Sequence, residues 1–407
     1  MFFVIGLKSQ NLNVFYNQSL EAYAKKDYQK YIALSLEALK INPTQPTILQ
    51  NLASGYALTN EKEAAAEILN RLLTWNTQIN YRGNTDLKAL LADANYMGML
   101  DETKSKYNTL AIGSMAYANL SGTFHLEDLV KAGPFFFFTD VHSGNVYRYS
   151  INGKKASKFI TLPLSAMAVT EGVENTTIWV SSAVVPQYIK GTVANVSPML
   201  YEINIATGQV LNSILLPKEA VVGSMVKAEN GMLYASDSSR PQIFVINTLQ
   251  KRLVKTIMIP EAKNLQGIDL NFTGDKLYVA DYLKGIFILD PVQERIQAWL
   301  SDDKYLLKGI DGIRFIDRRN LVAIQNNSTP KRVIKIMHID GRVQSIKLLD
   351  NKLPINGEPT NGFYDPQEGF YYIANSQWPF YDKDNKALYD KWETQQIRLI
   401  PVENLKR

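Results

Sequence analysis

Short runs of β-branched and aromatic residues alternate with Gly, Asn, Asp and Pro turns from about residue 124 onward. Six of these runs end in a similar way and recur about every 45 residues: Phe137–Asp140, Trp179–Ser182, Tyr234–Asp237, Tyr278–Asp281, Val322–Gln325 and Tyr372–Asn375. Another strand-like run follows each of them without an intervening helical pattern, which excludes a parallel α/β sheet. The pattern predicts a six-bladed β-propeller over residues 122–403, with one four-stranded blade per repeat.

The segment before the propeller has helical periodicity. Two stretches of residues 12–76 resemble each other at an offset of about 34 residues, the period of tetratricopeptide repeats. The matching pairs are Phe15 with Leu49, Ser19 with Ala53, Tyr31 with Ala65, and Ser35 with Leu69. Further helical pattern follows in residues 86–91 and 96–100, so residues 12–121 are predicted to form a tetratricopeptide-like helical domain. Two units are fewer than usual for independent stability, so we expect this domain to pack on a neighbour.

The chain begins with an apolar run, Met1–Leu7, followed by the polar residues Lys8–Asn11. Residues 1–11 look like the rear half of a secretory signal peptide whose basic start is missing. This interpretation predicts a periplasmic or secreted bacterial protein. The alternative is a short buried leader of the first helix in a cytoplasmic protein. No apolar run approaches the length of a transmembrane helix.

Composition narrows the classes of function. The 407 residues include 44 basic and 39 acidic side chains, without a run of five or more Lys and Arg, so a nucleic-acid partner is not expected. Cysteine is absent, which excludes disulfides and cysteine nucleophiles, and the three histidines form no close pair, so no zinc site is predicted. The remaining partners are a small molecule in the propeller channel, a protein bound to the helical repeats, or both.

A propeller binds ligands where its innermost strands converge on the central channel. Counting back about 14 residues from each repeated strand end reaches the start of the inner strand of the same blade. The polar residues found at these positions are Glu127, Ser224, Gln266, Asp311 and Thr360. The aspartates and the asparagine that close the repeated strands, Asp140, Asp237, Asp281 and Asn375, are predicted to form turns instead.

Residues 265–270, 274–281 and 311–313 resemble the blade motifs of the regucalcin/gluconolactonase and paraoxonase-like propellers. In that family a divalent cation, typically Ca²⁺, lies at the channel mouth. A glutamate, one or two asparagines and an aspartate hold it, and in the lactonases the aspartate is also the general base. The resemblance implies that Glu127, Gln266 and Asp311 bind the metal, that Asp311 is catalytic, and that the substrate is a lactone or ester.

Other residues extend this predicted site. Ser224, Thr360, His125 and Trp378 are candidate substrate-binding residues. His125 lies two positions before Glu127, hence on the same strand face, where it could assist a proton transfer; a structural histidine is the alternative. The sequence departs from the family where Gln266 and Ser224 stand at asparagine positions. The alternative function is therefore a non-catalytic binding or scaffold protein of the cell envelope.

Overall fold

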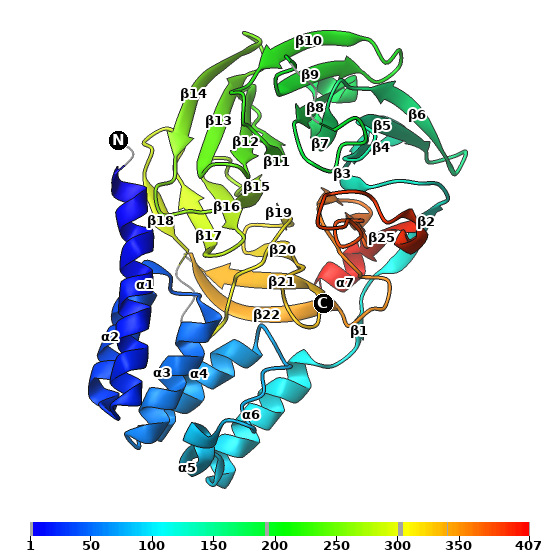
Figure 1. The fold of residues 1–407 in the computed structure, drawn as a ribbon. Coiled ribbons are helices and arrows are strands. Elements are labelled where there is room, and N and C mark those ends of the chain that lie inside the picture. Colours follow the sequence, from blue (N-terminus) through cyan, green and yellow to red (C-terminus); the bar gives the residue numbers. More distant parts are fainter. Residues whose placement is uncertain (1–2, 192–194, 300–303, 340, 407) are drawn as a thin grey trace.

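The computed structural model describes residues 3–191, 195–299, 304–339 and 341–406, and no side chain of residues 3–11. Residues 1 and 2, and the side chains of the expected signal-peptide segment 1–11, lie outside this description. The described residues form six antiparallel sheets around a common centre, preceded by helices (Figure 1). The sheets confirm the six-bladed propeller.

The first three blades follow the chain in simple up-and-down order. Blade one consists of β3 (Leu126–Ala132), β4 (Phe135–Asp140), β5 (Asn145–Ser150) and β6 (Lys155–Thr161). Blade two consists of β7 (Ser165–Glu171), β8 (Thr177–Ala183), β9 (Met199–Asn204) and β10 (Val210–Leu215). Blade three consists of β11 (Val222–Lys227), β12 (Met232–Asp237), β13 (Gln242–Asn247) and β14 (Arg252–Met258). A short 3₁₀ helix, η2 (Val173–Asn175), separates β7 and β8.

The last three blades complete the ring. Blade four consists of β15 (Leu265–Leu270), β16 (Leu277–Asp281), β17 (Gly285–Leu289) and β18 (Ile296–Ala298). Blade five consists of β19 (Ile313–Phe315), β20 (Asn320–Gln325), β21 (Arg332–Ile339) and β22 (Arg342–Asn351). Blade six contains β23 (Gly362–Asp365), β24 (Gly369–Ile373) and β25 (Gln395–Pro401), with η3 (Tyr389–Lys391) between the last two and α7 (Val402–Lys406) after them. The first strand of each blade lies nearest the centre, and β6, β10, β14, β18 and β22 lie at the periphery (Figure 1).

Two strands at the propeller edge come from residues that the sequence places before the propeller. β2 (Met115–Leu120) pairs with β25 and supplies the outer strand of blade six, and β1 (Ala111–Ile112) pairs with β22 of blade five. The expected boundary at residue 122 therefore falls after two strands of the propeller sheets. Pairing β2, which precedes blade one, with β25 of blade six closes the ring and covers an otherwise exposed strand edge.

The repeated strand ends correspond to β4, β8, β12, β16, β20 and β24, the second strand of each blade. The predicted turn role of the terminal aspartates is visible in their hydrogen bonds. Asp140 Oδ1 accepts from the backbone N of His142 (2.9 Å) and Ser143 (3.1 Å). Asp281 Oδ1 accepts in the same way from Leu283 (2.9 Å) and Lys284 (2.8 Å). These carboxylates hold the tight connections to the third strands, as expected for aspartate in turns.

The N-terminal segment is helical. It contains α1 (Phe3–Ala24), α2 (Tyr28–Ile41), α3 (Pro46–Leu58), α4 (Lys62–Leu73), η1 (Thr85–Leu87), α5 (Lys88–Leu91) and α6 (Ala94–Tyr107). α2 ends two residues before Pro43, which cannot continue a helix. Small side chains allow close packing, since a Cβ atom on Gly55 of α3 would lie 2.8 Å from Ile32 Cγ1. None of the described helices is both long and apolar enough to cross a membrane.

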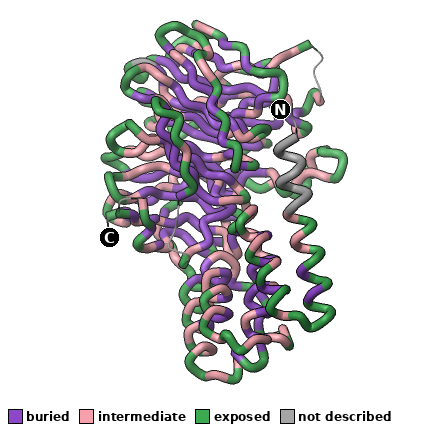
Figure 2. The backbone as a smooth tube through the Cα atoms, turned by 90° about the vertical axis from the view of Figure 1, so that its left-hand side faces the viewer, coloured by how far each residue is buried: buried purple, intermediate pink, exposed green. Residues whose placement is uncertain are grey.

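The helical segment lies against blades four and five (Figure 1). Leu306 of the propeller belongs to the same buried cluster as Leu69, Leu72 and Leu73 of α4. Buried residues run through the propeller and continue into the helices, whereas exposed residues line the outer helical faces (Figure 2). The expectation that the short helical array packs on a neighbour is met by the propeller itself.

Candidate functional site

β-Bulges lie at the start of the inner strands. The pairing register shifts between Leu126 and Leu129 in β3, between Val222 and Ser224 in β11, and between Leu265 and Ile268 in β15. A bulge inserts one extra residue and redirects the neighbouring side chains. The predicted ring residues Glu127, Ser224 and Gln266 fall in these three bulges, at the end of the channel that we call the channel mouth.

Glu127 is buried, with 8% of its surface exposed. Its Oε2 accepts a hydrogen bond of 2.6 Å from Trp378 Nε1. Burial raises the pKa of the Glu127 carboxyl well above its ordinary value, and the charge of Asp311 raises the pKa further, against the effect of the Trp378 bond. Glu127 and Trp378, two predicted site residues about 250 positions apart in the chain, are therefore brought together.

Asp311 precedes the inner strand β19 of blade five and lies at the channel mouth, like Glu127. Its Oδ2 accepts a hydrogen bond of 2.8 Å from Asn326 Nδ2. Burial raises the pKa of Asp311, and the charge of Glu358 raises it further. Glu358 is itself paired with Lys331. The mouth thus holds three acidic side chains, of which Glu358 alone has an ion pair within the described part of the chain.

Gln266 is turned towards blade three. Its Nε2 donates to Asn264 Oδ1 (2.8 Å), and its Oε1 accepts a long hydrogen bond from Ser238 Oγ (3.5 Å). The side-chain amide is therefore engaged at the boundary between blades three and four. Gln266 is the third ligand implied by the sequence resemblance, and in this arrangement its amide is bonded to Asn264 and Ser238.

Thr360 and Ser224 make contacts that tie the inner ring together. Thr360 Oγ1 donates to the backbone O of Glu127 (2.9 Å), which links blade six to blade one. Ser224 Oγ accepts from Asn361 Nδ2 (3.3 Å), which links the opposite blades three and six across the channel. Both hydroxyl-bearing residues are fully buried. The Thr360 hydroxyl therefore connects neighbouring blades of the inner ring. The Ser224 hydroxyl connects opposite blades across the channel.

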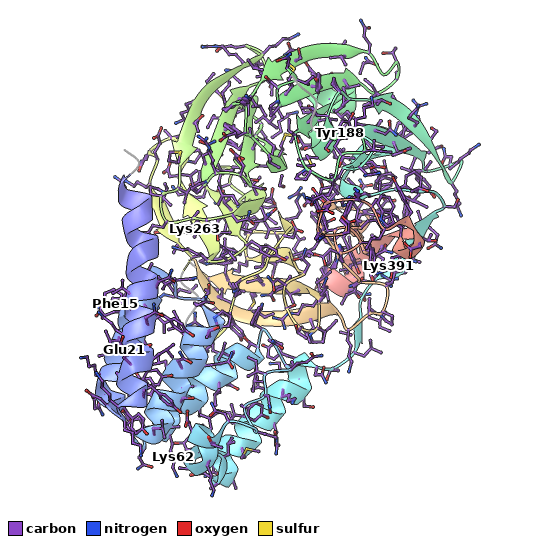
Figure 3. All side chains as sticks on the ribbon, in the orientation of Figure 1. Phe15, Glu21, Lys62, Tyr188, Lys263 and Lys391 are labelled. Carbon is purple, nitrogen blue, oxygen red and sulfur yellow. The ribbon has the colours of Figure 1, made fainter. Side chains whose placement is uncertain are left out.

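An aromatic group borders Glu127 on the side of blade one. The ring centroids of His125 and Trp378 lie 4.6 Å apart, and His125 Nδ1 lies 2.8 Å from Tyr381 Oη. Both partners belong to residues 374–394, the long connection between β24 and β25; Lys391 marks this connection in Figure 3. Burial, and then the charge of His142, lowers the pKa of His125 to about 3. His125 is therefore neutral at pH 7, and its buried Nε2 has no hydrogen-bond partner among the described residues.

Three residues of the mouth were not among the predicted site residues: Asn326, Tyr282 and Glu358. Tyr282 Oη donates to Asn326 Oδ1 (2.9 Å), so these two residues support Asp311 from blades four and five. A sequence signal exists for both, because each immediately follows a repeated strand end, Asp281 or Gln325. The turns after the second strands open at the same end as the starts of the inner strands.

The negative charge of the carboxylates at the mouth suits a hard cation, but few acidic side chains are available as ligands. Glu127 is buried and Asp311 is partly buried, and the charge of Asp311 raises the pKa of Glu127. Among the described residues, however, no three acidic or histidine side chains are grouped closely enough to hold a metal ion. Glu127 and Asp311 would therefore hold an ion together with neutral oxygens, which calcium accepts readily.

Comparison with known proteins identifies the class of fold. No family model and no curated protein matches the sequence. Among solved structures, U3-55K has a TM-score of 0.51 and 10% identity, covering 72% of this chain and 100% of that one. The Malassezia sympodialis allergen Mala s 1 has a TM-score of 0.51 and 12% identity, covering 68% of this chain and 92% of that one. A catalytically inactive virginiamycin B lyase from Staphylococcus aureus, with quinupristin, has a TM-score of 0.46 and 13% identity, covering 69% and 82%. At these identities the likeness shows the fold alone.

Proposed function

We propose that the channel mouth binds a divalent cation, Ca²⁺ by preference, through Glu127 and Asp311, and that a small lactone or ester is hydrolysed there. One observation carries the proposal: buried Glu127 and partly buried Asp311 are both bonded to the adjoining residues Thr360 and Pro359, Asp311 through Asn326, and no ion pair of the described residues neutralises either carboxylate. Burying two like charges is costly, so a bound dication would offset the cost that raises their pKa values.

Each residue of the mouth would have a separate role in binding the ion or in hydrolysis. Glu127, held by the Trp378 indole, and Asp311, held by the Asn326 amide, would bind the ion. A bound divalent cation polarises an ester or lactone carbonyl. Asp311 would also accept the proton of the attacking water, the role that the resemblance implies for the aspartate at this position. Trp378 and Tyr381 would form the aromatic side of the substrate pocket.

The second candidate is a non-catalytic binding protein. It is favoured by the protein contacts already made by the predicted ligands: Trp378 bonds to Glu127, Asn326 bonds to Asp311, and Gln266 is engaged by Asn264. In this function the tetratricopeptide-like helix pairs α1/α2 and α3/α4 would bind a protein partner, and the propeller would act as a platform. The apolar start of the chain supports the cell envelope as the proposed location, with the cytoplasm as the alternative.

Titration calorimetry with CaCl₂ and MgCl₂ tests the proposal. We expect the wild-type protein to bind Ca²⁺, and Asp311→Asn and Glu127→Gln each to lose affinity by about tenfold or more, because ligand charge sets affinity at such sites. Asp365→Asn is the matched control, since Asp365 lies at the far end of β23 and pairs with Lys131.

Hydrolysis of a lactone and ester panel, with and without a chelator, then separates the two candidates. Turnover that needs the added cation and is lost in Asp311→Asn supports the hydrolase. Cation binding without turnover on any substrate supports the binding protein. If the wild-type protein binds no divalent cation, the metal-dependent function is wrong.

A further inference from the structure

The loop between β20 and β21, residues 326–331, contacts both the channel mouth and the helical segment. At its start Asn326 Nδ2 donates to Asp311 Oδ2 (2.8 Å) and to the backbone O of Pro359 (3.0 Å). Three residues further on, the backbone N of Thr329 donates to the O of Trp75 (3.0 Å), and its O accepts from the backbone N of Thr77 (2.9 Å). Thr77 Oγ1 also donates to this oxygen (3.2 Å). One short loop thus joins the residues after α4 to the acid of the mouth.

A second connection runs through the turn between β16 and β17 of blade four. Tyr282 Oη donates to Asn326 Oδ1 (2.9 Å), so this turn holds the other side of the same amide. The next residue, Leu283, accepts a hydrogen bond at its backbone O from the Thr44 hydroxyl, in the turn between α2 and α3. Lys284 Nζ donates to the backbone O of Ile41 (3.0 Å). On the helical side these contacts are made by Ile41, the last residue of α2, and by Thr44 in the turn that follows. The turn between β16 and β17 therefore bonds to the helical segment as well as to Asn326.

Close backbone packing limits how far these loops can move independently. The N of Gly309 donates to the O of Tyr282 (2.8 Å), and the N of Asn327 donates to the O of Gly309 (3.2 Å). Gly309 has a φ of 65°, and a Cβ atom there would lie 2.3 Å from Asn327 Cβ. The contact tolerates only glycine. A displacement of either loop would thus be passed to the other through backbone contacts.

Arg332 anchors the junction behind the loop. Its guanidinium is buried and donates through Nη2 to the backbone O of Thr74 (2.6 Å) and through Nε to Gln325 Oε1 (2.9 Å). Gln325 immediately precedes Asn326. The end of α4 is therefore connected through two side chains to the residue next to the Asp311 partner.

We propose that Asn326 is a positioning residue for Asp311, and that the helical segment sets the place of Asn326 through the two loops. Site and helical segment are then coupled: a partner that shifts α2–α4 changes cation affinity at the mouth, and a bound cation changes the affinity for that partner by the same factor. The inference rests on the proposed function in taking the mouth as the cation site. It adds that the helical segment positions Asn326, and through it Asp311, in addition to packing against the propeller.

The double variant Thr44→Val/Thr77→Val tests the coupling. It removes the two helical-side hydroxyls that bond to the loops while nearly preserving side-chain shape, and neither residue touches the carboxylates of the mouth. Thr248→Val is the matched control, because Thr248 is similarly buried and its hydroxyl donates to Gly231 O (2.8 Å) in blade three. Asn326→Ala removes the positioning amide directly.

Two readouts are measured on the full-length chain. We expect the double variant and Asn326→Ala to lose about threefold to tenfold in Ca²⁺ affinity by calorimetry. We also expect faster hydrogen exchange, by about threefold or more, at the backbone amides of Asp311 and Asn327 in the double variant. Thr248→Val should change neither readout.

The exchange readout does not depend on a bound cation, so the two proposals can fail separately. If the wild-type protein binds no Ca²⁺, the proposed function is wrong, while local exchange at Asp311 and Asn327 still decides the coupling. Unchanged exchange at these amides in the double variant overturns the inference. An equal increase across all six blades also overturns it, since that result indicates general loosening.

Discussion

At the scale of single residues, two aspartates of the inner strands, buried Asp128 and partly buried Asp269, join neighbouring blades. Asp128 Oδ2 in β3 accepts from the backbone N of Val169 (2.9 Å), and Asp269 Oδ2 in β15 accepts from the backbone N of Phe315 (2.6 Å). Each carboxylate thus bonds to the inner strand of the following blade. Burial raises the pKa of Asp128 to about 7 and that of Asp269 to about 6, against the attraction of Arg314. Burial thus favours the protonated form of both acids, whereas the backbone hydrogen bonds that they accept favour the carboxylates.

Asp269→Asn tests this pKa effect. Because the folded protein holds the Asp269 proton more tightly than the unfolded chain, the wild-type free energy of unfolding falls as pH rises from about 4 to about 6. The variant lacks this proton, so its stability relative to wild type should rise by up to about 2 kcal/mol between about pH 4 and pH 8. Urea unfolding at several pH values measures the difference.

Asp275→Asn is the control for this experiment. Asp275 lies in an exposed turn of the same blade, where hydrogen bonds from Thr273 and then from Asn271 lower its pKa. Its substitution should therefore lower relative stability with rising pH only below about pH 4, and should give no trend between about pH 4 and pH 8. A pH-independent difference for Asp269→Asn would contradict the raised pKa.

At the scale of elements, β2 closes the ring. Leu120 at its end is buried in a cluster with Leu126 of β3 and Ile397 of β25, so the strand contributes both hydrogen bonds and apolar contacts to the seam between blades six and one. The strand precedes the first blade in the chain but is built into the last one. Closure of this kind removes the exposed edge that an open sheet would present.

Leu120→Ala should lower the free energy of unfolding by about 2–4 kcal/mol, because the truncation leaves a cavity in this cluster. Leu110→Ala, at a site with 54% of its surface exposed just before β1, should change stability by less than about 0.5 kcal/mol. Denaturant titration followed by tryptophan fluorescence compares the two variants. Equal small effects would show that the seam does not depend on β2.

At the scale of the whole molecule, the helical segment and the propeller share a buried junction. Arg332 lies at its centre with 2% of its surface exposed, and burial lowers the pKa of its guanidinium to about 10. The ring of Tyr107 lies 5.3 Å from the guanidinium carbon. A buried charge held by both parts makes their separation costly, since either part alone would leave polar groups without partners. We therefore expect the two parts to unfold together.

Arg332→Met should uncouple them. The wild-type protein should lose its far-ultraviolet circular dichroism and its tryptophan fluorescence in one thermal transition. In the variant the helical signal should be lost first, because about 2–3 kcal/mol of charged hydrogen bonding is removed from the junction. Arg319→Met, at an exposed site in the same blade, should behave like wild type. Coincident transitions in Arg332→Met would argue against Arg332 as the link.

The sequence alone determined the six blades, the turn aspartates and the helical start, because each depends on local patterns: alternation along a strand, side chains that bond to nearby backbone, and helical periodicity. It also identified Glu127 and Asp311 at the inner ring, because the repeat fixes equivalent positions. The tertiary structure decided what depends on distant contacts. Pairing of β2 with β25 joins the two ends of the propeller, Gln266 turns to a neighbouring blade, and Asn326 supports Asp311 from a loop that the helical segment holds. No local pattern specifies these, since they arise only when the ring closes and the helices pack against it.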